Sequence, residues 1–152
     1  MLFFIRKFNK FLIVISVVIS LDQISKNIFS INYDYFLNKD LLIFSFKYIR
    51  NYGAAFNIFE GNRIFLSLIS ILSSLILIYF IFFQERLNSL NRYGLSLILA
   101  GSLGNGIDRI LKGYVIDFIK LNTFDFPIFN IADISINIGC ILLIFNYFKY
   151  KK

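Results

Sequence analysis

The chain has 152 residues, of which 58% are hydrophobic, and a net charge of +7. This apolar share exceeds that of ordinary water-soluble domains, so we expect one membrane domain over residues 1–152. The basic residues lie at the edges of apolar runs and build no continuous basic face, which argues against nucleic-acid binding. Histidine is absent and Cys140 is the single cysteine. These facts exclude His-dependent nucleophiles, the usual zinc sites and a disulfide framework.

The first predicted element is a transmembrane helix over about residues 8–28. Basic residues precede its apolar run, as in a secretory signal peptide, but no small-residue cleavage site follows, so we expect it to be uncleaved. Residues 31–60 are predicted to form an external loop that contains β-structure, because residues 42–49 are rich in Ile, Phe and Tyr.

Three further transmembrane helices are predicted over about residues 64–83, 93–111 and 130–148. The first of these is uncharged throughout and long enough to cross a bilayer. Gly113 is expected to end the second by adopting a left-handed conformation, and residues 114–121 are expected to be extended.

The distribution of basic residues favours a cytoplasmic location for both termini. In that orientation the basic residues divide equally between the two sides. The inside segments are shorter, however, so their basic density near the helix ends is higher, which is the quantity that governs orientation.

Four aspartates fall at one level of this arrangement, near the external ends of the helices: Asp22, Asp108, Asp117 and Asp133. A charge inside a bilayer costs about 2.5 to 3.5 kcal/mol, so ionisable groups in such segments are functional candidates. The alternative is that each aspartate marks a helix end at the interface, which is the weaker interpretation for four together.

Two of these aspartates follow an asparagine by three residues, which places each amide and carboxylate on one helix face. The pairs are Asn105 with Asp108 and Asn130 with Asp133. An amide there could orient its neighbour, although capping of a helix is an alternative for the second pair. For Asp22 and Lys26, an ordinary ion pair is as plausible as a catalytic role.

Four blocks of sequence, in order along residues 21–139, resemble the lipoprotein signal peptidases (signal peptidase II), a family of aspartyl membrane peptidases. The blocks are residues 21–26 (LDQISK), 50–56 (RNYGAAF), 104–118 (GNGIDRILKGYVIDF) and 129–133 (FNIAD), the last followed by Ile136 and Gly139. The chain departs from the family at residues 100–102, where AGS replaces a more usual GGA, and at Asn57 and Phe126.

The resemblance implies a mainly α membrane protein, with four transmembrane helices and a small extracytoplasmic antiparallel β-sheet cradle. It implies an aspartic-type endopeptidase of the bacterial inner membrane that cleaves prolipoproteins before a diacylglyceryl-modified cysteine, with its active site near the external face. The catalytic pair falls on Asp117 and Asp133. The positions that bind substrate or support the site are Asp22, Lys26, Asn51, Gly53, Asn105, Asp108, Arg109 and Asn130.

Such a pair would share one proton and activate a water molecule, without a metal or cofactor. The expected partners are the lipidated prolipoprotein and membrane lipid, and we expect a monomer. Two other classes stay open, a proton or cation transporter and a non-enzymatic assembly subunit. A nucleophilic pair of Ser25 and Lys26 is a poor alternative, because adjacent residues point to different helix faces.

Overall fold

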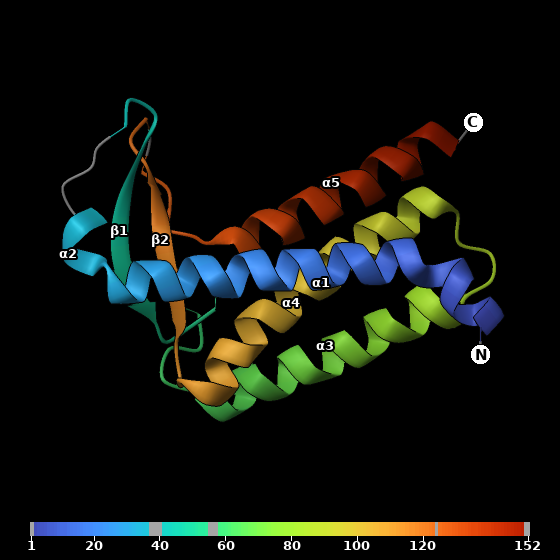
Figure 1. Cartoon of the computed structure of the whole chain (residues 1–152), viewed down its shortest axis with the longest axis horizontal. Helices are drawn as coiled ribbons and strands as arrows, with labels where there is room; N and C mark the ends of the chain where they lie inside the picture. Colours follow the sequence, from blue (N-terminus) through green and yellow to red (C-terminus); the bar gives the residue numbers. More distant parts are fainter. Residues whose placement is uncertain (1, 37–40, 55–57, 124, 151–152) are drawn as a thin grey trace.

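The protein is a bundle of long helices with a small sheet at one end (Figure 1). The computed structural model describes residues 2–36, 41–54, 58–123 and 125–150, and the side chains of these except residues 2–7, 33 and 150. Residues 55–57, which include the end of the second resemblance block and Asn57, lie outside the described residues.

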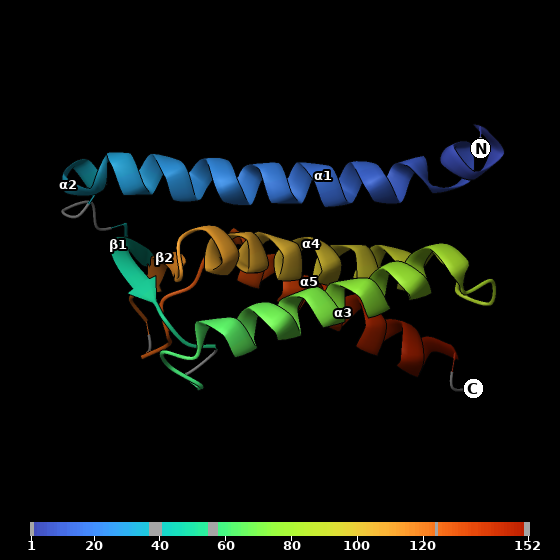
Figure 2. The same ribbon diagram turned by 90° about the horizontal axis from the view of Figure 1, so that it is seen from below.

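The long helices are α1 (Leu2–Ile31), α3 (Arg63–Phe83), α4 (Ser89–Leu111) and α5 (Ile131–Tyr150). Helix α4 packs against the other three (Figure 2). The start of α1 and the end of α5 both lie at the end of the bundle away from the sheet (Figure 1). The chain therefore passes along the bundle four times and finishes at the end where it began.

Two helices begin earlier than the sequence analysis predicted. Helix α1 begins at Leu2 rather than near residue 8, because Lys and Arg before the apolar run are good helix formers although they are unsuited to a bilayer interior. Helix α4 begins at Ser89 rather than near residue 93, because the Asn88 side chain accepts a hydrogen bond from the Asn91 N–H at 2.9 Å. Hydropathy therefore located the apolar spans, whereas propensity and capping set the helix ends.

Three helices within the described ranges are long and apolar enough to cross a membrane, and they cover Phe8–Ile31, Arg63–Phe83 and Ile131–Lys149. Large apolar side chains point outward from them; Leu72, for example, is 62% exposed. Helix α4 is more polar because it carries Asn105 and Asp108, which are buried against its neighbours.

Helices α4 and α5 approach each other so closely that two glycines are required between them. A Cβ atom at Gly101 would collide with the carbonyl oxygen of Ala132, and one at Gly139 would lie 2.5 Å from the carbonyl oxygen of Gly94. Small residues allow this kind of close backbone packing between membrane helices. The contact holds the start of α5 against the part of α4 that carries Asn105.

Strand β1 (Phe44–Asn51) pairs with strand β2 (Val115–Leu121) in a two-stranded antiparallel sheet. The register runs from Phe44 opposite Leu121 to Asn51 opposite Val115, with an irregularity between Phe46 and Ile49. The strands cross the end of the helix bundle, and a short helix α2 (Tyr33–Phe36) joins α1 to this region (Figure 1).

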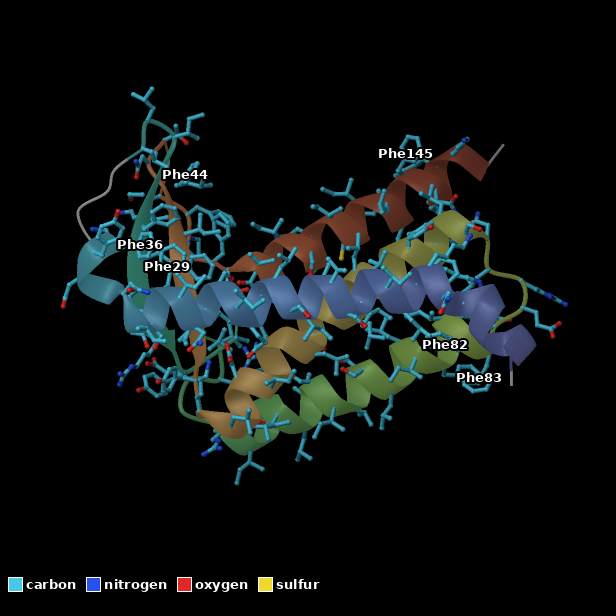
Figure 3. All side chains as sticks on the ribbon, viewed as in Figure 1. Phe29, Phe36, Phe44, Phe82, Phe83 and Phe145 are labelled. Carbon is cyan, nitrogen blue, oxygen red and sulfur yellow. The ribbon has the colours of Figure 1, made fainter. Side chains whose placement is uncertain are left out.

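Aromatic side chains connect α1 to the sheet. Phe29 stacks on Phe118 of β2 with 4.3 Å between ring centroids, and its ring also lies 4.5 Å from Phe36 and 4.8 Å from Phe46. Phe29 and Phe36 lie beside the strands in Figure 3. Burial of these rings fixes the sheet relative to the helices.

At the opposite end, the buried guanidinium of Arg92 binds the end of α3. It donates to the carbonyl oxygens of Ile81, Gln84 and Leu87, the last two at 2.6 and 3.3 Å, and lies 5.2 Å from the Phe8 ring centroid. These carbonyls have no partners within α3, so Arg92 satisfies groups that are costly to leave unpaired in an apolar environment.

Candidate active site

The ten residues singled out in the sequence come together where the helices meet the sheet. Helix α1 contributes Asp22 and Lys26, and α4 contributes Asn105, Asp108 and Arg109. The remaining five are Asn51 at the end of β1, Gly53 after it, Asp117 on β2, and Asn130 and Asp133 at the start of α5. Hydrogen bonds and ion pairs connect all ten.

Asp117 reaches this region because α4 ends sharply and the chain turns into β2. Gly113 has a φ of +87°, and its N–H donates to the carbonyl oxygens of Asp108 and Arg109, both at 3.2 Å. A left-handed residue directly after a helix satisfies its last carbonyl groups and reverses the chain. The predicted role of Gly113 is therefore confirmed.

Each carboxylate oxygen of Asp117 and Asp133 accepts one hydrogen bond. In Asp117, Oδ2 accepts from Asn51 Nδ2 at 2.9 Å and Oδ1 accepts from Asn130 Nδ2 at 2.6 Å. In Asp133, Oδ1 accepts from Asn105 Nδ2 at 2.8 Å and Oδ2 accepts from the Asn130 backbone N–H at 3.1 Å. Asn130 thus binds both carboxylates.

Asn130 also caps α5. Its Oδ1 accepts from the Asp133 N–H at 3.0 Å, and the Asp133 carboxylate accepts from the Asn130 N–H in return. This reciprocal pair satisfies two N–H groups at the helix start. Capping and contact with Asp117 therefore occur in the same residue, so the two interpretations of Asn130 are compatible.

A buried charged layer lies on the α1 side of these carboxylates. The Lys26 ammonium lies 2.8 Å from Asp22 Oδ2 and 3.0 Å from Asp108 Oδ2, and all three side chains are 0% exposed. The Lys112 ammonium pairs with the other oxygen of Asp108 at 2.9 Å. The Asp22–Lys26 ion pair, one of the two interpretations of their spacing, is present. Lys112 was not singled out, although it stands four residues after Asp108, the same helical spacing.

The four aspartates therefore separate into two kinds. Asp22 and Asp108 are neutralised in buried ion pairs, whereas Asp117 and Asp133 line a cavity of about 490 Å³. Position along the chain placed all four at one level but could not distinguish these environments. The carboxylates available to a bound molecule are those of Asp117 and Asp133.

The rest of the cavity wall is mainly apolar, with hydroxyl groups from two helices. Ser73 on α3 and Ser102 on α4 both line it, with 3.1 Å between their hydroxyl oxygens. Residues 126–129 and Ile136 supply apolar surface. The α3 wall was not predicted, because serines within an apolar helix carry no signal of their own. Such a wall with a few polar groups is typical of a binding site.

Arg109 and Gly53 form another part of this region. Arg109 Nη2 donates to the Gly53 carbonyl oxygen at 3.0 Å, and the Gly53 N–H donates to Asn51 Oδ1 at 2.9 Å. Arg109 Nε is buried and has no hydrogen-bond partner among the described residues. Because Arg109 lines the cavity, this guanidinium can serve a bound acceptor.

The environment of Asp117 favours its protonated form. Burial, and next the charge of Asp133, raise the pKa of Asp117 from 3.8 to about 7, against the opposing hydrogen bonds of Asn51 and Asn130. A carboxyl group with this pKa can exchange a proton near neutral pH. Within the described ranges, no three or more His, Cys, Asp or Glu side chains are arranged to hold a metal ion.

Comparison with known proteins gives consistent results. The family model for signal peptidase (SPase) II matches residues 14–149. A lipoprotein signal peptidase of Microcystis aeruginosa is 40% identical over 149 residues, which cover 96% of each chain. One from Lactobacillus johnsonii is 43% identical over 139 residues, which cover 90% of each chain.

Solved structures agree with these relatives. A bacterial membrane enzyme determined by the in meso method at 2.3 Å resolution has a TM-score of 0.86 and 36% identity, over 95% of this chain and 92% of that one. A second, at 1.9 Å resolution, has a TM-score of 0.84 and 35% identity, over 94% and 95%. The chain therefore belongs to the signal peptidase II family of membrane peptidases.

Proposed function

We propose that the protein is an aspartic-type endopeptidase that cleaves the signal peptide of bacterial prolipoproteins before a diacylglyceryl-modified cysteine. Asp117 and Asp133 are the proposed catalytic pair. The observation that carries this proposal is that these two carboxylates, unlike those of Asp22 and Asp108, line the cavity and are bound by the same asparagine, Asn130.

The proposed reaction uses the pair as acid and base. Two neighbouring carboxyl groups share one proton, because two charges at close range repel each other. The ionised member removes a proton from water as the water oxygen attacks the scissile carbonyl carbon, and the protonated member donates its proton to the carbonyl oxygen. Collapse of this intermediate breaks the C–N bond: the amine leaves with the proton that the pair took from water, and one hydroxyl of the intermediate returns its proton to the pair as the carbonyl re-forms.

Supporting residues hold the substrate and the acids. Arg109 Nε is a buried donor without a partner among the described residues, which suits it to bind a peptide carbonyl of the substrate. Asn51, Asn105 and Asn130 hold the carboxylates through their amide groups. Lys26, Asp22 and Asp108 form the charged layer behind them.

The proposed location is the bacterial inner membrane, with one domain over residues 1–152 and four membrane passes. Helix α4 would be the fourth spanning helix, because α1, α3 and α5 surround it and its buried polar groups face them. The start of α1 and the end of α5 lie at the end of the bundle away from the sheet (Figure 1). This arrangement supports cytoplasmic termini and an extracytoplasmic sheet. The acyl chains of the substrate would stay in lipid while its peptide enters the cavity, and one monomer with membrane lipid suffices.

Cleavage by purified variants in lipid tests this proposal. D117N and D133N are each reconstituted with a prolipoprotein carrying diacylglyceryl cysteine, and the products are followed by gel shift. We expect both variants to remain folded and to lose cleavage. D125N is the matched control, because Asp125 is exposed and does not line the cavity, so its cleavage should equal that of the wild type. Retained cleavage by either D117N or D133N would reject the pair.

A further inference from the structure

The amide groups that bind the two carboxylates are held in one orientation by donors that cannot accept. Asn51 Oδ1 accepts from the Gly53 N–H at 2.9 Å, and Asn130 Oδ1 accepts from the Asp133 N–H at 3.0 Å. A backbone N–H only donates, so each contacted atom must be the amide oxygen. The NH₂ end of each side chain is therefore the end that faces Asp117.

Asn105 is oriented in a different way, by a charged side chain from another helix. The Lys26 ammonium lies 2.9 Å from Asn105 Oδ1, and both side chains are buried. An ammonium group has three donors and no acceptor, so the atom that it contacts must be the oxygen. The Asn105 NH₂ group is thereby left to donate to Asp133 Oδ1 at 2.8 Å.

Among the described residues, no other contact orients Asn105 as strongly. Asn130 Nδ2 also lies 3.2 Å from Asn105 Oδ1, but its two hydrogens are divided among this oxygen, Asp117 Oδ1 at 2.6 Å and the Ile116 carbonyl oxygen at 3.3 Å. The bond from Lys26 is shorter than this one and is charge-assisted, which makes it the stronger of the two. Without it, a turn of the Asn105 amide would set its oxygen against a carboxylate oxygen of Asp133.

Lys26 contacts Asn105 from within a layer whose positive and negative charges are equal in number. On α1 it faces Asp22, and on α4 it faces Asp108, which Lys112 also neutralises. The two aspartates and two lysines sum to zero charge. Among the described residues, the charged groups of the cavity wall, beyond this layer, are Arg109 on α4, Asp117 on β2 and Asp133 on α5.

We propose that Lys26 is a positioning residue, which fixes the Asn105 amide so that its NH₂ group donates to Asp133 and holds that carboxylate in place. This inference rests on the proposed peptidase function. Lys26 does not line the cavity, so it acts through Asn105 and not on the substrate.

A double-mutant cycle tests whether the effect of Lys26 passes through Asn105. K26M, N105A and the double variant are compared with the wild type in the reconstituted cleavage assay. We expect K26M to lower kcat by about 100-fold, the size of effect that misplacement of a catalytic group produces, with KM changed by less than about threefold. In the N105A background, K26M should lower kcat by less than about twofold, because the amide that it orients is gone.

K112M is the matched control for the charged layer. It removes the other ion pair of Asp108 but leaves the contact between Lys26 and Asn105, so its kcat should stay within about twofold of the wild type.

Three results would contradict the inference. The first is that the losses in K26M and N105A multiply, and the second is that K112M loses as much activity as K26M. If K26M does not fold, the charge-balanced variant D22N/K26M replaces it in the cycle. The third contradicting result is a kcat of D22N/K26M equal to that of the wild type. Failure of the peptidase proposal looks different, because D117N or D133N would then retain cleavage.

Discussion

Replacement of Asp117 by asparagine should make the folded protein more stable at alkaline pH while it removes activity. The pKa of Asp117 is 3.8 in its ordinary environment and about 7 in the fold, chiefly because burial disfavours the charged carboxylate. Between these values the folded state binds the proton more tightly than the unfolded state does. The stabilisation that this tighter proton binding gives the folded state is therefore fully present below pH 3.8. It is lost as the pH rises to about 7.

The size of this effect follows from the two pKa values. The change from 3.8 to about 7 corresponds to about 4 kcal/mol lost from the free energy of unfolding of the wild type. Asparagine cannot ionise, but its NH₂ group would face a donor, either Asn51 or Asn130, at a cost of about 1 to 3 kcal/mol. D117N should therefore be less stable than the wild type near pH 4 and more stable near pH 8.

Thermal unfolding in detergent from pH 4 to pH 8 measures this crossing. At about 2 to 4 °C per kcal/mol for a chain of this size, the Tm of D117N relative to the wild type should rise by roughly 8 to 16 °C across the range. D125N, which changes an exposed carboxylate, should show no such trend. A Tm difference between D117N and the wild type that is constant with pH would refute the reasoning.

Other predictions concern packing and the cavity. G101V should lower the free energy of unfolding by about 3 kcal/mol or more, seen as a lower Tm in detergent, because its side chain would meet the backbone of α5; an unchanged Tm would contradict the close packing. S102F should raise KM for the lipidated peptide at least about tenfold with little change in Tm, because the ring would fill the cavity; an unchanged KM would place the substrate elsewhere. R92M should lower Tm without a change in KM, because the carbonyls at the end of α3 lose their donor far from the cavity; equal Tm values for R92M and the wild type would show that those carbonyls need no partner.

Local features of the sequence predicted local parts of the site. The uninterrupted apolar run of α3 located that helix. The spacing of Asp22 and Lys26 allowed an ion pair as one of two interpretations, and the spacing of Asn130 and Asp133 allowed a cap as an alternative; both contacts are present. Each of these depends on residues within one or two helical turns. Periodicity is sufficient for them.

Contacts between distant segments could not be predicted in this way. Spacing places Lys26 on a face of α1, but it does not say that this face meets Asn105, 79 residues later, or that Asp22 accepts the N–H of Ala132. For the same reason the sequence could not divide the four aspartates into ion-paired and cavity-lining residues. Which helix faces meet depends on packing, here on the glycine contact between α4 and α5.

The polarity of α4 has a consequence for how the protein is made. A helix that carries Arg92 and Asn105 gains little by entering lipid alone, because those side chains find their partners on other segments of the chain. In the proposed four-pass arrangement, α3 and α4 would leave the translocation machinery as a hairpin, with Arg92 already bound to the carbonyls at the end of α3. Assembly would finish only when α1 and α5 supply the partners of Asp108 and Asn105, so the chemistry of the site and the biogenesis of the protein would depend on the same buried groups.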